Sequence, residues 1–144
     1  MSSSNPYYVG LQNVGSYQVS GIPFASSSMT APVSSGTPVQ VTFPTVTQRV
    51  IVENLGNYDL RVGFSSNGVK GTNYFIVHKH GGATPAQYNH IDFKVKVSSI
   101  YLLSDDASNT TTVSVAAELT NIDTDLLTVS GPSGSNWSGS LGVG

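Results

Sequence analysis

Two histidines separated by one residue, His78 and His80, are the side chains in this sequence best suited to bind a metal ion. Residues two positions apart on a β-strand face the same way, so the two imidazoles could chelate one cation. His90 is the only later histidine that could complete such a site. The chain has no cysteine, which excludes disulfides, thiolate catalysis and Cys-based zinc sites.

The histidine pair resembles the His-x-His element of cupins, but the residues that follow it differ. Cupins place a Glu ligand within a few residues of the second histidine, whereas this chain continues with residues 81–87 (GGATPAQ), which contain no acid. We therefore interpret His78 and His80 as polar residues at the end of a strand, and we expect no metal and no cofactor.

The adjacent carboxylates Asp105 and Asp106 suggest either a calcium site or the paired acids of a hydrolase. Neighbouring residues on a strand or turn point apart, while cleavage of a glycosidic bond needs two carboxyl groups that converge on it. The surrounding residues 105–109 (DDASN) have the composition of a turn. We interpret the pair as turn residues, with a weak surface calcium site as the alternative.

No other catalytic pattern is complete. The chain has 22 serines but no Gly-x-Ser-x-Gly elbow. Residues 68–72 (GVKGT) echo a phosphate-binding loop, yet they lack its Gly-x-x-x-x-Gly-Lys-Ser/Thr spacing and a following helix. We therefore expect that the protein is not an enzyme, and we assign no catalytic, cofactor-binding or metal-binding residue.

The elements that must position these residues are β-strands, because apolar and polar side chains alternate as they do on a half-buried strand. The clean alternations are residues 39–43, 58–65, 91–98 and 112–119. Residues 49–53, 74–77 and 100–103 are apolar on both faces, as expected of central strands or strands covered by a neighbour. Residues 16–20 are a weaker eighth candidate. The sequence predicts an all-β sandwich or barrel of about eight antiparallel strands, with no helix between residues 47 and 121.

The alternation also assigns side chains to the two faces of each strand. We expect seven residues to point into the core: Leu60, Val62, Phe64, Phe93, Val95, Val113 and Val115. Arg61 and Lys94 fall on the opposite, solvent-facing positions.

Charge is sparse in this chain, at 10% of residues and a net value of −2, compared with about 25% charged residues in typical proteins. All six Lys and Arg lie between Arg49 and Lys96 and form no dense patch, so we expect no direct nucleic-acid binding. The 22 Ser and 13 Thr supply polarity without charge, which suits surfaces that become covered. With no signal peptide and no long apolar run, we expect synthesis in the cytoplasm and no membrane span.

Three regions follow along the chain. Residues 1–38 form an N-terminal arm with the first strand, residues 39–122 form the core of the domain, and residues 123–144 form a Gly/Ser-rich C-terminal arm. The Ser- and Pro-rich residues 25–38 contain too few large apolar side chains to build a core. Tyr7, Tyr8 and Trp137 stand isolated in the arms, as anchors on a partner surface or as residues that pack back on their own domain.

The order of these segments resembles the small single jelly-roll capsid proteins of large icosahedral double-stranded DNA viruses, and their penton, or vertex, protein most of all. The resemblance covers residues 15–121 and rests on strand order and texture, not on a diagnostic motif. It is carried by residues 15–24 (GSYQVSGIPF), 39–43 (VQVTF), 48–54 (QRVIVEN), 60–65 (LRVGFS) and 113–120 (VSVAAELT).

The resemblance implies a single jelly roll of two four-stranded sheets in the virion capsid, a homopentamer at each fivefold vertex, and contacts with the major capsid protein and other minor capsid proteins. It carries over no site residue, because the family has no catalytic motif. Two alternatives stay open: a minor capsid or decoration protein, and a carbohydrate-binding attachment module in which Tyr74, Tyr88 and Tyr101 line a groove.

Overall fold

The computed structural model describes residues 22–80, 89–124, 139 and 141–144. Nine elements follow one another along this part of the chain: β1 (Ile22–Ala31), β2 (Val39–Thr42), β3 (Thr47–Asn54), β4 (Leu60–Gly63), α2 (Ser66–Lys70), β5 (Tyr74–Val77), β6 (His90–Phe93), β7 (Ser99–Ser104) and β8 (Thr111–Leu119). The expected strand at residues 16–20, the turn at residues 81–82, and Tyr7, Tyr8, Tyr88 and Trp137 lie outside the described residues.

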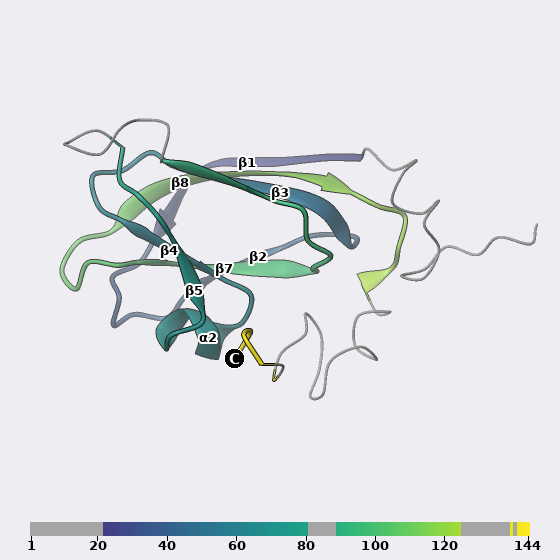
Figure 1. Cartoon of the computed structure of the whole chain (residues 1–144). Coiled ribbons are helices and arrows are strands. Elements are labelled where there is room, and N and C mark those ends of the chain that lie inside the picture. The colour runs from purple at the N-terminus through teal and green to yellow at the C-terminus, as the bar shows by residue number, and fades with distance from the viewer. Residues whose placement is uncertain (1–21, 81–88, 125–138, 140) are drawn as a thin grey trace, which may run out of the picture.

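The strands form two four-stranded antiparallel sheets that face each other as a β-sandwich (Figure 1). One sheet has the order β1-β8-β3-β6, which we call the first sheet, and the second has the order β2-β7-β4-β5. Only β4 and β5 are consecutive in the chain and paired in one sheet, so every other connection crosses between the sheets. The all-β prediction is confirmed.

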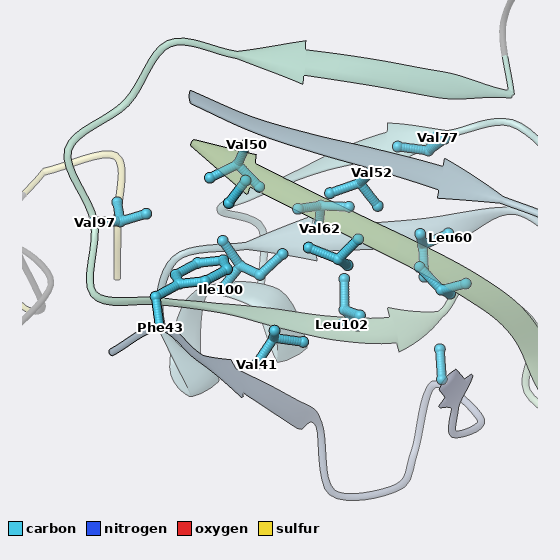
Figure 2. Packing of buried hydrophobic residues seen from close by; sticks show 14 of the residues in the cluster. Val41, Phe43, Val50, Val52, Leu60, Val62, Val77, Val97, Ile100 and Leu102 are labelled. Atoms are coloured by element: carbon cyan, nitrogen blue, oxygen red, sulfur yellow. The ribbon is translucent and has the colours of Figure 1, made fainter. Parts of the chain in front are cut away.

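The core lies between the two sheets, where side chains from both inner faces meet (Figure 2). On β8 the buried residues are every second one from Thr111 to Leu119, and on β4 Leu60 and Val62 are buried. This alternation is the consequence of a pleated strand with one face on the core. The inward positions predicted for Leu60, Val62, Val113 and Val115 are confirmed.

Phe64, Phe93 and Val95 pack against the core, as their inward assignment predicts, but all three are only half-buried. The Phe64 and Phe93 rings pack edge to face with centroids 5.7 Å apart at the margin of the core. Phe64 directly follows the last residue of β4, and Phe93 is the last residue of β6.

Aromatic pairs close the two long sides of the sandwich, where the edge strands of the two sheets meet. On one side Phe24 of β1 packs edge to face on Phe43, next to β2, with ring centroids 5.1 Å apart. On the other side Phe75 of β5 packs edge to face on Phe93 of β6 at 6.0 Å. These contacts place β1 beside β2 and β5 beside β6.

The expectation of no helix between residues 47 and 121 is wrong, because α2 is a five-residue α-helix after β4. The Ser65 side chain caps it by accepting a hydrogen bond from the backbone N–H of Gly68 (2.8 Å), and Gly71 follows its last residue. Val69 of α2 and Leu103 of β7 are both fully buried outside the main core. The helix therefore covers part of the outer face of the second sheet, as Figure 1 shows.

The first described strand, β1, lies in a segment whose serines led us to expect an arm without core residues. Phe24 and Ser26 face inward, and after a β-bulge between Ser26 and Met29 the inward residues are Met29 and Ala31. The bulge changes the inward positions from even to odd numbers, so no single alternation runs through the strand. Ala31 is completely buried, and residues 25–31 do contribute to the core.

Two of the three strands that are apolar on both faces, β3 and β7, are central in their sheets. The third, β5, is an edge strand, and its Phe75 is 52% exposed. In the described part of the chain no helix is long and apolar enough to span a bilayer.

Candidate functional site

Charge divides the sandwich into two contrasting sides. Residues 22–48, which include β1, β2 and the loop at residues 32–38, contain no Asp, Glu, Lys, Arg or His. We call β1, β2 and this loop the uncharged side. The charged side consists of β5, β6 and the flanking residues 78–80 and 94, and it carries His78, Lys79, His80, His90, Asp92 and Lys94.

The uncharged side presents a long open strand edge. β1 has ten residues and forms the end of the first sheet, and within the described chain it pairs only with β8. Proteins usually protect such an edge with charges, because its free N–H and C=O groups invite another strand. Here Pro23 and the bulge interrupt the edge, but no charge does, and Ile22 is 45% exposed. An edge of this kind suits a surface that is covered by another chain.

A shallow hollow of about 250 Å³ lies on the outer face of the first sheet, beside the bulge. Most of the residues that line it are small or apolar, and Glu53 is the one charged residue among them: Ala25, Ser26, Ser27, Ile51, Glu53, Ser114, Val115 and Ala116. The hollow can accept an apolar or small polar group.

Three charged residues of the first sheet form a paired network on its outer face. Arg49 of β3 binds the carboxylates of Asp92 on β6 and Glu118 on β8, and Gln48 donates to Glu118 at 3.1 Å. Hydrogen bonds from Arg49 hold the pKa of Asp92 below its usual range, and the two carboxylates raise the pKa of Arg49. The positive charge is therefore neutralised within the sheet and is not presented to a phosphate backbone.

Asp105 and Asp106 bind different partners, and the turn interpretation is confirmed. Asp105 accepts a 2.7 Å hydrogen bond from Arg61 Nε. Asp106 Oδ1 accepts from the backbone N–H groups of Ser108 and Asn109 at 2.8 and 2.9 Å, and these bonds lower the pKa of Asp106. The pocket of about 320 Å³ beside them, which Asp59 and Lys79 also line, is built from turn residues that bind one another.

His78 and His80 lie beyond the end of β5, so they do not share a strand face. His78 Nδ1 is 3.8 Å from Asp59 Oδ1, whereas His80 Nδ1 is 3.3 Å from the side-chain nitrogen of Asn89. Among the described residues, no three His, Asp or Glu side chains come together as a metal-binding group.

The side chain of Asn54 links several segments of the chain through hydrogen bonds, although its sequence context predicts only a turn residue. Its side chain is fully buried and makes four hydrogen bonds: it donates to the carbonyls of Tyr58 (2.7 Å) and Val77 (3.2 Å), and accepts from Gly56 N–H (3.0 Å) and Thr111 Oγ1 (2.7 Å). Gly56 has no room for a side chain, because a Cβ would lie 2.0 Å from Thr111 Oγ1. The only sequence signal was the Asn-Leu-Gly-Asn turn composition.

Of the tyrosines proposed for a carbohydrate groove, the two described ones, Tyr74 and Tyr101, do not converge on an open surface. Tyr74 and Tyr101 flank Gly63 in neighbouring strands, and all three belong to the outer face of the second sheet. Val69 of α2 packs directly over Gly63, where a Cβ would lie 2.9 Å from the Val69 side chain. The Tyr74 ring is also occupied by the Arg61 guanidinium, 4.5 Å from its centroid. The helix therefore separates the two tyrosines.

A scan of the chain against protein-family profiles found no match, and a search of curated proteins found none either. The functional argument therefore rests on the chain's own residues.

Proposed function

We propose that this protein is a structural capsid protein, the subunit of a homopentamer that closes the fivefold vertices of an icosahedral virion. Its partners are then other copies of itself, the major capsid protein and other minor capsid proteins. It acts without an enzymatic reaction or cofactor, and it is made in the host cytoplasm before it enters the particle.

The observation that carries this proposal is the uncharged side of the sandwich. A ring of identical subunits brings one surface of each copy against a different surface of the next, and contact over such an area removes water from every group in it. Burial of an unpaired charge there would be costly, whereas Ser, Thr and backbone groups can find hydrogen-bond partners. β1, β2 and the loop between them offer such a surface, with the free edge of β1 at its margin.

The strand order supports the jelly-roll form of this fold. Orders of β1-β8-β3-β6 and β2-β7-β4-β5 arise when two Greek keys wind an antiparallel chain into two sheets. Jelly rolls are used by viral capsid proteins and by lectins alike, so the topology favours both classes. The separation of Tyr74 from Tyr101 by α2 weighs against the lectin alternative. A minor capsid or decoration role would use the same surfaces at another position on the particle.

The decisive experiment is a reconstruction of the native particle with fivefold symmetry imposed only at the vertices. Five copies of this chain around each vertex are the expected result. Copies on threefold sites, on the faces, or on projecting stalks would contradict the vertex role and leave the sandwich intact.

A solution experiment tests the surface itself. Ala25 of β1 and His90 of β6 are both exposed residues on the two opposite edge strands of the first sheet. We expect Ala25→Lys to reduce pentamer formation, measured by light scattering, because it adds an unpaired charge to the uncharged side. The matched control, His90→Lys, adds the same charge to the charged side and is expected to leave the pentamer unchanged. Equal loss in both variants would place the contact elsewhere.

A further inference from the structure

Residues 141–144 return to the sandwich and bind at the start of α2, far in sequence from the strands around it. Figure 1 shows this segment, in yellow, beside α2 on the outside of the second sheet. The Ser65 hydroxyl donates a 2.8 Å hydrogen bond to the carbonyl oxygen of Val143. The same hydroxyl accepts from the Gly68 N–H, so one buried side chain joins the helix cap to the returning segment.

The site and the segment can pack closely because glycine, which has no side chain, lies at the contact on both of them. At Gly68 a Cβ would lie 2.1 Å from the Val143 carbonyl oxygen. At Gly144, whose φ of +94° favours glycine, a Cβ would lie 2.7 Å from the Gly68 Cα and 3.2 Å from Asn73 Oδ1. Two backbones can approach this closely only where both residues are glycine. The contact is therefore selective for this segment, although it is small.

The connection between the segment and the sandwich is long. Residues 125–140 join Thr124 to Leu141 and, if fully extended, reach roughly 50 Å. β1, with ten residues, is only about 33 Å long. A tether of this reach gives its end an effective concentration on the order of millimolar at its own site, a level that closely packed neighbouring subunits can match.

We propose that the site formed by Ser65, Gly68 and Asn73 binds the Leu141–Gly144 segment of a second copy of this chain. The segment is then exchanged between neighbouring subunits, as identical elements are in domain swapping. The inference rests on the proposed function for the assembly that supplies the second copy. Each subunit gives its segment to a neighbour and receives another, so the contact links subunits at a surface separate from the uncharged side.

Complementation between two full-length variants tests the exchange. Gly144→Val, isotopically labelled, keeps an intact site but has a segment that cannot dock, because its side chain would meet Gly68. Unlabelled Gly68→Ala keeps an intact segment but fills its own site. In a mixture, only docking between chains can join an intact segment to an intact site. The Gly68 amide resonance reports it, since that N–H bonds to the hydroxyl that holds Val143.

We expect the labelled Gly68 resonance to move about half or more of the way back to its wild-type position at millimolar chain concentration. Unlabelled protein that carries both substitutions is the negative control and should cause no shift. Asn67→Ala, an exposed change on the same helix, should complement the labelled chain at least as well as wild type. If Gly68→Ala does not fold, Ser65→Ala replaces it, because that change removes the donor to Val143.

A labelled resonance that stays unshifted with both site-blocked variants overturns the exchange and leaves docking within one chain. Light scattering of the same samples measures the oligomeric state independently. A pentamer without a shift contradicts only the exchange, whereas a shift in chains that never form pentamers contradicts only the vertex role.

Discussion

The two long sides of the sandwich are closed by similar aromatic contacts but stabilised by different interactions. On the uncharged side, Phe43 is buried to 1% exposure against Phe24 and there is no ionisable group within residues 22–48. On the charged side, Phe75 is 52% exposed. The residues next to its strands are linked by side-chain hydrogen bonds: Asn54 donates to the Val77 carbonyl, and Asn89 donates to the Asn54 carbonyl and contacts His80.

This difference indicates that the charged side is suited to contact with solvent and the uncharged side to contact with another chain. Water solvates the charges of β6 and the half-exposed aromatic of β5 at little cost, so the charged side is compatible with solvent. The uncharged side has an edge without charges and a small-residue hollow next to it, and both features become favourable when another chain covers them. Apolar packing holds one side together, and side-chain hydrogen bonds hold the other.

The largest expected effect comes from removal of the two closing aromatics. Phe43→Ala should lower the free energy of unfolding by about 4 kcal/mol, because it empties a fully buried site. Phe75→Ala should lower it by less than about 1 kcal/mol, since half of that ring already faces water. Urea unfolding of the two variants measures both values. Equal costs would mean that the sides are equally packed.

Asn54→Ala should have the next largest effect, a loss of about 3 kcal/mol. The change leaves buried partners such as Thr111 Oγ1 and the Val77 carbonyl without their hydrogen bonds. Asn57→Ala, an exposed change in the same turn, is the control and should be nearly neutral. Urea unfolding at pH 7 provides the comparison. If Asn54→Ala leaves the free energy of unfolding unchanged, the polar network does not stabilise the charged side.

Strand alternation predicted most of the fold, because burial on one face imposes it wherever the strand is regular. It overextended β6, which ends at Phe93 although the alternation continues to Val97. Beyond Phe93 the Thr47 side chain accepts a hydrogen bond from Val97 N–H and donates one to the Val95 carbonyl, and the Thr47 N–H donates to the Val97 carbonyl. Alternation reports which face is buried, and does not report whether a neighbouring backbone is paired.

The missed features depend on contacts that sequence spacing does not encode. α2 is too short for a helical period, and its local signals are only the Ser65 cap and Gly71 at its end. The bulge in β1 shifts the inward positions and hides them among serines. The uncharged run at residues 22–48 is visible in the sequence, but only the sheet order places β1 and β2 at edges on the same side.

Salt should affect the two sides differently. Assembly through the uncharged side has no ion pairs of its own to screen, so the pentamer dissociation constant should change little between 50 and 500 mM NaCl. An interface through the charged side would instead weaken or strengthen markedly over that range. Sedimentation velocity at several salt concentrations measures the constant. A steep salt dependence would indicate that the subunits contact one another through the charged side.

The smallest expected effect is the acid stability contributed by two carboxylates, Asp92 on the charged side and Asp106 in a turn next to the loop of the uncharged side. Asp92 lies on β6 and takes its lowered pKa first from Arg49 hydrogen bonds, whereas Asp106 takes its lowered pKa first from the Ser108 N–H. The Asp106 turn also contacts the loop of the uncharged side, through its carbonyl and Ser34 N–H at 3.0 Å.

Both carboxylates have folded-state pKa values below the unfolded one, so each stabilises the protein above the unfolded pKa of about 3.9. That contribution is lost as the pH falls from there through the folded pKa. Asp92→Asn and Asp106→Asn should each flatten the loss of stability in this acid range. In 0.5 M NaCl the effect of Asp92→Asn should shrink, because salt screens an exposed ion pair, while that of Asp106→Asn should persist. Thermal unfolding from pH 5 to pH 2 at both salt concentrations tests this, and equal shrinkage would mean that charge attraction, not directed N–H groups, stabilises Asp106.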